Sequence, residues 1–309
     1  ANTTGTQNVA VGSNALDANT TANDNTAVGH NSLTAATTGA GNTAVGAFSL
    51  ITVTDGTSNT AMGLSALRTN AASNNTALGQ SAMYANTTGG NNTAVGANAL
   101  DTNTTGASNV CLGYNAGTAI TTGGENTCVG ATAGDALTTG TNNVVIGSGS
   151  AVSAVDGSGA NVMGRNVSGV AGYTTLGSGG DDIAAAHGNV TWATVSDERV
   201  KKDIEDATVG LNFINDLRPV TFNYKNKGDI PEEFNGYEED SAEAYKNSEA
   251  QHGFIAQEVK ATIDKHSDIK DGFSLWREEE ITGQQRVGEA ALIPMLVKSI
   301  QELSAEVEQ

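Results

Sequence analysis

Hydrophobic and polar positions follow a 17-residue period through the first half of the chain. The glycine of an Asn-Thr-Ala-Val-Gly motif recurs ten times, at Gly12, Gly29, Gly46, Gly63, Gly79, Gly96, Gly113, Gly130, Gly147 and Gly164. The spacing is 17 residues throughout, except for one of 16 between Gly63 and Gly79. An apolar residue precedes each glycine, and an asparagine lies four positions before all but the last, where Ala160 stands. Such a period identifies a structural repeat, and its regular register argues against low-complexity disorder.

Each repeat offers one or two short strands separated by Gly and Asn, residues that tolerate the positive φ of turns. Seventeen residues are too few for a pair of helices but suit one coil of a β-solenoid. Stacking the coils should bury the alternating Ala and Val positions, and the aligned asparagines should form a hydrogen-bond ladder in the turns. Ten coils spaced by about 4.8 Å predict a shaft of roughly 50 Å. With 5% aromatic residues the core is thin, which favours a trimer.

A different pattern follows the repeat. We expect a small α+β domain with a helix at 208–215, a strand at 220–224, an acidic loop at 226–250 and a strand then a helix at 253–264. The last segment spaces its apolar residues as a coiled-coil seam: Ile293, Leu296, Ile300, Leu303 and Val307. Pro294 is acceptable in the first turn of that helix. The stripe predicts a helical coiled coil or bundle with other copies, and a helix packed on its own domain is the alternative.

The chain therefore divides into a repeat shaft at 1–147, a Gly/Ser-rich degenerate repeat and linker at 148–195, and a third region at 196–309. Within the linker, 188–192 is interpreted as a short strand. Charge divides in a similar way, because residues 1–195 contain nine acids and only two bases. The formal net charge of −19 excludes nucleic acid as a partner. No apolar run is long enough to predict membrane insertion.

Two cysteines, Cys111 and Cys128, occupy the same slot in successive repeats, where other repeats have alanine. We interpret them as two small buried thiols. A disulfide or a metal site is the alternative, although no other Cys or His joins the pattern. The sequence predicts no cofactor and no metal.

The junction at residue 196 carries the candidate chemistry. Ser196 is followed five residues later by Lys201, the pair that a Ser–Lys hydrolytic dyad needs. A lysine acts as a base only when neutral, which requires burial or a nearby cation to lower its pKa by roughly three units. Lys202 or Arg199 could supply that cation. Alternatively, Ser196 is only a helix N-cap and the lysines are solvated charges.

Four motifs carry a resemblance to a known family. They are Ser196-Asp-Glu-Arg-Val-Lys-Lys-Asp-Ile204, Leu217-Arg-Pro-Val-Thr-Phe-Asn-Tyr224, Gly253-Phe-Ile-Ala-Gln-Glu-Val259 and Leu292-Ile-Pro-Met-Leu-Val-Lys-Ser-Ile-Gln-Glu-Leu303. Together they resemble the C-terminal, self-cleaving intramolecular chaperone domain of endosialidase-type phage tailspikes and tail fibres. The repeat is similar to the head repeat of YadA-type trimeric adhesins, with a longer coil, and this resemblance implies a trimeric left-handed parallel β-roll.

The resemblance implies a homotrimeric fibre of a phage virion that attaches to a receptor on the host-cell surface, expected to be a glycan. It implies a serine endopeptidase that acts once in cis, with Ser196 as nucleophile and Lys201 as base, cutting between Val195 and Ser196. A bacterial surface adhesin or injection-system fibre with a retained, uncleaved trimerisation domain is the alternative. A polysaccharide-degrading spike is disfavoured, because 1–195 shows no paired carboxylates in an aromatic setting.

Overall fold

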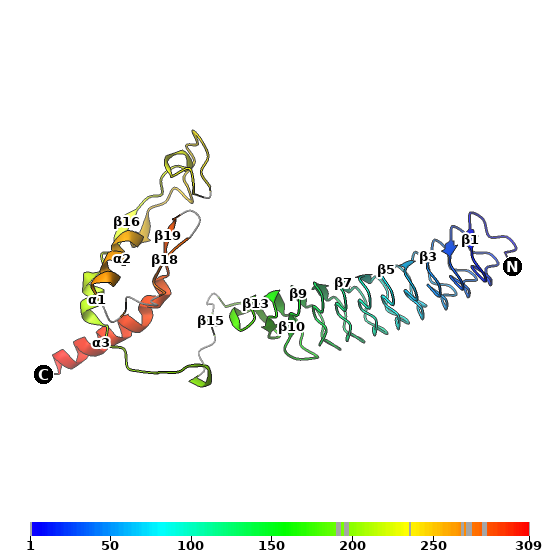
Figure 1. Ribbon diagram of the computed structural model, residues 1–309, viewed down its shortest axis with the longest axis horizontal. Helices are drawn as coiled ribbons and strands as arrows, with labels where there is room; N and C mark the ends of the chain where they lie inside the picture. The colour runs from blue at the N-terminus through cyan, green and yellow to red at the C-terminus, as the bar shows by residue number, and fades with distance from the viewer. Residues whose placement is uncertain are drawn as a thin grey trace. The chain divides into compact units, whose positions relative to one another are not determined.

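The computed structural model describes residues 2–189, 193–194, 198–234, 236–266, 269, 274–279 and 283–308. The chain forms two compact units, residues 1–197 and 198–309. Figure 1 shows the stacked coils of the first unit and the mixed helices and strands of the second.

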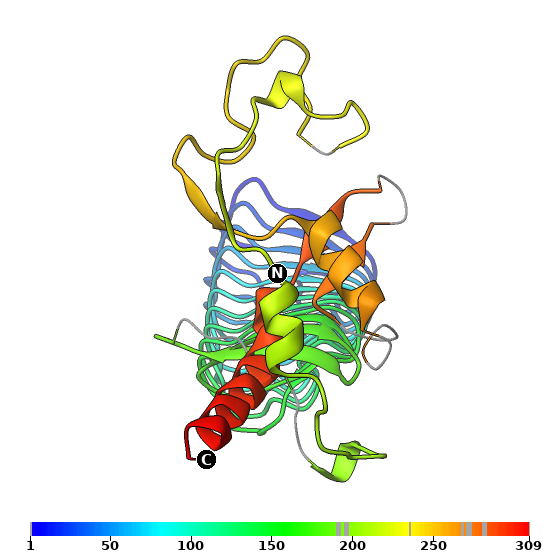
Figure 2. The same cartoon turned by 90° about the vertical axis from the view of Figure 1, so that its left-hand side faces the viewer.

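The first unit is a parallel β-solenoid with one three-residue strand per coil. Its strands are β1 (Val9–Val11), β2 (Thr26–Val28), β3 (Thr43–Val45), β4 (Thr60–Met62), β5 (Thr76–Leu78), β6 (Thr93–Val95), β7 (Val110–Leu112), β8 (Thr127–Val129) and β9 (Val144–Ile146). Each strand pairs in parallel with the equivalent residues of the next coil, as Ala27 does with Ala44. Figure 2 shows these coils end-on, stacked upon one another. The predicted solenoid of 17-residue coils is confirmed.

Asparagines four residues before the repeat glycine form a continuous buried ladder, as predicted. The Oδ1 atom of each accepts a hydrogen bond from the backbone N–H at the same position in the next coil, at 2.8 to 3.1 Å. Its Nδ2 atom donates to a backbone carbonyl 13 or 14 residues further on, at 2.8 to 2.9 Å. From Asn25 to Asn143 these side chains are almost completely buried. The ladder thus replaces part of the missing apolar core with satisfied polar groups.

Alternation along each strand gives the solenoid an inner and an outer face. From β2 to β9 the middle residue of each strand, Ala27 in the second coil and Ala44 in the third, is fully buried. The expectation that the Val positions are buried as well is wrong, because neighbouring residues of a strand point to opposite faces. The third strand position lies on the outer face, where Val11 is 57% and Met62 44% exposed. An apolar stripe, here called the shaft stripe, therefore follows the third strand position from coil to coil.

We expect Asn92→Ala to destabilise the shaft strongly. The change removes the acceptor for the N–H of Asn109 and the donor to the carbonyl of Gly106, both at 2.8 Å. Two buried polar groups would lose their partners, a loss of about 2 to 5 kcal/mol in the free energy of unfolding. Urea denaturation followed by circular dichroism measures it. Asn161→Ala, on an exposed strand position, is the matched control. Equal unfolding midpoints for the two variants would refute a stabilising ladder.

The two cysteines pack in adjacent coils as free, buried thiols, which confirms the first of the two interpretations. Cys111 lies opposite Cys128 in the parallel ladder between β7 and β8. A hydrogen bond with the Cys128 thiol and burial raise the pKa of the Cys111 thiol. The larger sulfur is accommodated by glycine nearby: a Cβ at Gly117 would lie 2.6 Å from the Cys111 Sγ. In this coil the strand residue is therefore larger than in most other repeats, and the turn residue that packs against it is smaller.

The roll continues beyond its regular period and then reverses. The additional strands are β10 (Ala151–Val152), β11 (Asn161–Arg165), β12 (Ser168–Gly169), β13 (Tyr173–Ser178), β14 (Asp181–Ala186) and β15 (Ala193–Thr194). Strand β11 pairs in parallel with β9 and β13, so that Gly164 lies opposite Gly177. After a turn at Gly179, β14 and β15 add in antiparallel fashion. Most of the strand expected at 188–192 lies outside the described residues, and β15 begins just after it.

The second unit is a small α+β fold. It contains η1 (Glu198–Val200), α1 (Leu211–Asp216), β16 (Val220–Phe222), η2 (Lys227–Asp229), β17 (Gln251–Gly253), α2 (Ala256–Lys265), β18 (Trp276–Glu278), β19 (Gln285–Val287), η3 (Glu289–Leu292) and α3 (Ile293–Val307). Two antiparallel ribbons, β16–β17 and β18–β19, accompany the helices. The expected order of helix, strand, loop, strand and helix is present, and α1 begins three residues later than expected.

A compact apolar core joins the three helices of this unit. Phe213 of α1 and Leu275 before β18 are fully buried, and Val259 and Ile263 of α2 are nearly so. Helix α1 has no side-chain N-cap of its own. Instead, the carboxylate of Glu302 in α3 accepts the N–H of Leu211 at 2.8 Å. This bond, which spans 91 residues of sequence, attaches α3 to the rest of the unit.

Candidate functional site

The predicted cleavage site lies at the border of the two compact units. Val195 and Ser196 fall outside the described residues. On the N-terminal side of the site, β15 pairs with β14, so that Ala193 lies opposite Ala184. On the other, η1 begins at Glu198, and the backbone N–H of Lys201 donates to the carbonyl of Glu198 at 3.0 Å. In the sequence, the peptide bond in question thus falls between the end of β15 and the start of η1.

Three cations predicted to serve the dyad follow this border within four residues. Arg199, Lys201 and Lys202 are all exposed in the single chain. The residues after Lys202 are irregular and exposed up to Val209, which enters the core. Because Ser196 lies outside the described residues, the distance between its Oγ and the Nζ of Lys201 is open, and the dyad stays a prediction.

Helix α3 places its predicted seam on its outer face. Ile293, Leu296, Ile300, Leu303 and Val307 are between 44% and 86% exposed. The unit is held instead by the opposite face of the helix, where Leu292 and Ser299 are buried and Met295 packs against the core. Helix α3 thus packs on its own domain, as the alternative interpretation has it, but through this other face. The apolar stripe, here called the helix stripe, stays exposed.

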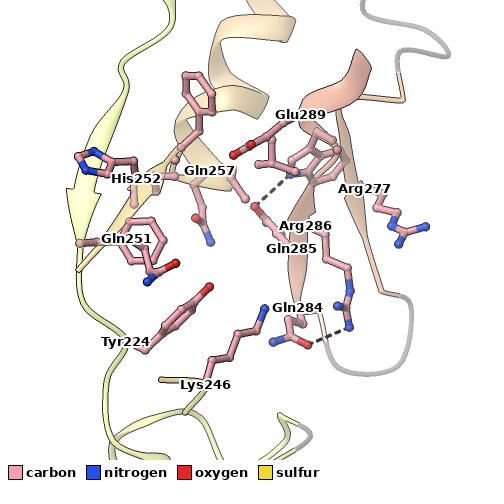
Figure 3. A pocket seen from close by; sticks show the side chains of 18 of the residues that line it. Tyr224, Lys246, Gln251, His252, Gln257, Arg277, Gln284, Gln285, Arg286 and Glu289 are labelled. Carbon is pink, nitrogen blue, oxygen red and sulfur yellow. Dashed lines mark hydrogen bonds between the residues drawn. The ribbon is translucent and has the colours of Figure 1, made fainter. Parts of the chain in front are cut away.

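A pocket that the sequence did not predict opens between the two ribbons. It has a volume of about 960 Å³ and is lined by every residue of β17 and of β19, with the start of α2 beside them. Figure 3 shows Gln251 and His252 on one side of it and Gln284, Gln285 and Arg286 on the other. The Trp276 indole N–H donates to the Gln285 Oε1 at 3.2 Å. Its volume and its mixture of aromatic, amide and charged groups are typical of a binding site.

The sequence held one weak signal of this pocket. Aromatic residues are scarce in the chain, and several of them line it, namely Phe222, Tyr224, Tyr245, Phe254 and Trp276. They come from separate segments, and only the antiparallel pairing of two short ribbons brings them together. Such pairing depends on long-range contacts, so the grouping could not be predicted from spacing along the chain.

An acidic loop, residues 226–250, connects β16 to β17. Lys227 holds it together, because its Nζ lies 2.8 Å from carboxylate oxygens of both Glu238 and Glu243. A hydrogen bond from Lys227 lowers the pKa of Glu238. Desolvation, with the charges of Glu232, Glu239 and Asp240, raises the pKa of Tyr237. The tip of the loop is thus a strongly negative region.

Within the described ranges, no three His, Cys, Asp or Glu side chains gather as a metal site would require. The helices in those ranges are also too short or too polar to cross a membrane.

Comparison with known proteins gives one family. Residues 196–268 match the model of a peptidase family described as chaperone of endosialidase. No curated protein and no solved structure matches the chain. The matched segment begins at Ser196 and runs through α1, the two strands β16 and β17, and α2. Residues 196–268 of this chain are therefore similar to the chaperone of endosialidase family.

Proposed function

We propose that this chain is a segment of a homotrimeric phage tail fibre that attaches to the host surface through its shaft. The C-terminal unit directs the trimer to fold and is then released by self-cleavage between Val195 and Ser196. The observation that carries the proposal is the start of the family match at Ser196, next to the border between the two compact units. A chaperone placed there can leave without disrupting the shaft.

Self-association is supported by two apolar surfaces that the single chain leaves exposed. The shaft stripe follows the solenoid, and Val11 and Met62 are exposed along it. The helix stripe covers α3, where Ile300 is 66% exposed. Burying apolar surface releases about 25 cal/mol per Å², so contiguous stripes of this kind favour association. Parallel copies would place equivalent stripes side by side in both units.

The cleavage is an acyl transfer followed by hydrolysis. Neutral Lys201 takes the proton of the Ser196 hydroxyl, and the Ser196 Oγ attacks the carbonyl carbon of Val195. The C–N bond to Ser196 breaks as the ester forms, and the freed amine receives a proton. Water then hydrolyses the ester, which leaves a carboxylate on Val195 and restores the Ser196 hydroxyl. The reaction is irreversible once the C-terminal unit departs, so the shaft would be trapped kinetically.

Exposure of Lys201 in the single chain links cleavage to assembly. A lysine remains protonated in water, and it becomes a base only where burial or a neighbouring cation disfavours its charged form. Lys201 and its neighbours Arg199 and Lys202 are exposed here. In our proposal, association of three copies covers this segment and completes the dyad. Uncut chains would then persist until the trimer forms.

We expect Ile300→Asp combined with Leu303→Asp to abolish both trimer formation and cleavage. Both side chains lie on the helix stripe, and charges buried in a shared seam are strongly destabilising. Gln301→Asp with Ser304→Asp is the control, because these exposed positions lie beside the stripe on the same helix. Light scattering reports the mass, and denaturing gel electrophoresis reports the cut. A monomeric wild-type chain would refute the self-association proposal.

A further inference from the structure

Two arginines face each other across the ribbon beside the pocket. Arg277 of β18 lies directly opposite Arg286 of β19 in the antiparallel register. Like charges in directly opposed positions destabilise a two-stranded ribbon. Arg286 donates to the Gln284 Oε1 at 3.3 Å, which compensates no charge. In the part of the chain that the structure describes, neither arginine forms an ion pair. The fold thus retains an unfavourable pair of cations that an anionic partner would stabilise.

The pocket beside the two arginines adds further positive charge. Lys246, Arg277 and Arg286 line it, whereas Glu289 is its one carboxylate among the described residues. The Nζ of Lys246 lies 5.4 Å from the centre of the Tyr224 ring. The two arginines also line a second cavity of about 360 Å³ next to Glu278 and Glu279. In a chain with a net charge of −19, such a concentration of cations is unusual.

The acidic loop has the complementary charge. Between Asp229 and Glu243 it contains seven carboxylates and no lysine or arginine. Among the described residues no cation pairs with Glu232, Glu233, Glu239 or Asp240, all of which are exposed. Only Tyr245 and Lys246, at the end of the loop, line the pocket of the same chain. Lys227 therefore holds the acidic tip compact through Glu238 and Glu243, and within the described residues the other carboxylates of the tip form no ion pair.

We propose that the acidic tip of one copy, residues 229–243, binds in the pocket of a second copy, against Lys246, Arg277 and Arg286. The inference rests on the proposed function, in which copies of this chain associate. The carboxylates of the tip would neutralise the opposed arginines. The side chains of Ile230 and Phe234 could pack on the aromatic wall of the pocket. The loop of each copy would thereby link neighbouring domains at a site separate from the helix stripe.

Zero-length cross-linking tests whether this contact joins two copies. Full-length Ser196→Ala chains are used so that the C-terminal unit stays attached. Chains labelled with ¹⁴N and ¹⁵N are refolded together and treated with a water-soluble carbodiimide, which joins an amine to a carboxylate in contact with it. Mass spectrometry should find Lys246 joined to a carboxylate within 229–243, with the two peptides differing in isotope. Only same-isotope pairs in a mixed oligomer would show that the loop folds onto its own pocket, and would overturn the proposal.

Charge reversal tests the energetics. Arg277→Glu with Arg286→Glu should raise the dissociation constant of the oligomer about tenfold or more, because a favourable charge contact becomes repulsive. Adding Glu232→Lys with Glu233→Lys to the same chain should restore most of the affinity. Arg165→Glu with Lys265→Glu is the matched control, which changes the net charge equally at exposed positions away from the pocket. Sedimentation at low and high salt measures the dissociation constant of the wild type and of these three variants.

The outcomes separate this inference from the proposal on which it rests. A wild-type chain that is monomeric overturns both. An oligomer whose dissociation constant is the same in the arginine variant and in its control overturns the docking contact alone. In a third outcome, the arginine variant weakens the oligomer while the added lysine changes fail to restore its affinity. That result would place a different anionic partner at the arginines and overturns the assignment of the acidic tip.

Discussion

Ser196→Ala should leave every chain at full length, while the wild type yields a C-terminal fragment that begins at Ser196. The substitution removes the oxygen that attacks Val195, so no ester can form. Lys201→Ala should have nearly the same effect, because the serine hydroxyl then keeps its proton. Intact-mass spectrometry after expression measures both. Each chain should still form a trimer, since Lys201 is exposed and contributes to neither apolar core.

Two further measurements make this test specific. Lys202→Ala should slow cleavage in part, if its charge helps to keep the neighbouring amine neutral. The wild-type rate should rise with pH as the base loses its proton, as long as the trimer persists. A cut at another bond, or normal processing of Ser196→Ala, would eliminate the dyad. A wild-type chain that stays whole would make the C-terminal unit a retained trimerisation domain.

A chain that ends at Val195 should be poorly soluble when it is expressed alone. Without the C-terminal unit nothing brings the copies into register, and the shaft stripe stays exposed. Val11, Met62 and Leu78 of this stripe are between 43% and 57% exposed in the single chain. Exposed apolar patches of this kind lead to aggregation. We expect the yield of soluble shaft to fall about tenfold or more, as measured by size-exclusion chromatography of the clarified lysate.

The control for this result is the shaft that the full chain releases. After cleavage and removal of the C-terminal unit it should remain a soluble trimer, because its unfolding is slow rather than because the chaperone is present. Equal yields of soluble trimer with and without residues 196–309 would refute the chaperone role. The Ser196→Ala chain shows in parallel whether the shaft is soluble with the unit still attached.

The repeat could be predicted in detail because its information is local. A glycine and an asparagine at fixed spacing determined the coil length, and the asparagine ladder followed from that spacing. The error concerned which strand positions are buried. Ala44 and Val45 are neighbours with opposite orientation, so that only Ala44 points inward. The outer position of Val45 and its equivalents became clear only from the fold.

In the second unit, periodicity identified helix α3 and its stripe, but the structure decided which face of the helix packs. Leu292, Met295 and Ser299 face the core, and the bond from the Leu211 N–H to Glu302 attaches the helix there. The more apolar face is the exposed one. A pattern of apolar residues therefore indicated that the helix has a partner surface, and only the tertiary contacts showed that this surface is not the chain's own core.

By itself, the sequence determined the solenoid and predicted the candidate dyad, because each depends on residues close together in the chain. The tertiary structure alone decided the outward direction of the two apolar stripes and the pocket between β17 and β19. It also placed Arg277 opposite Arg286. These features depend on strand register and on contacts across tens of residues, which are set by the packing of the whole unit and leave no periodic signal in the chain.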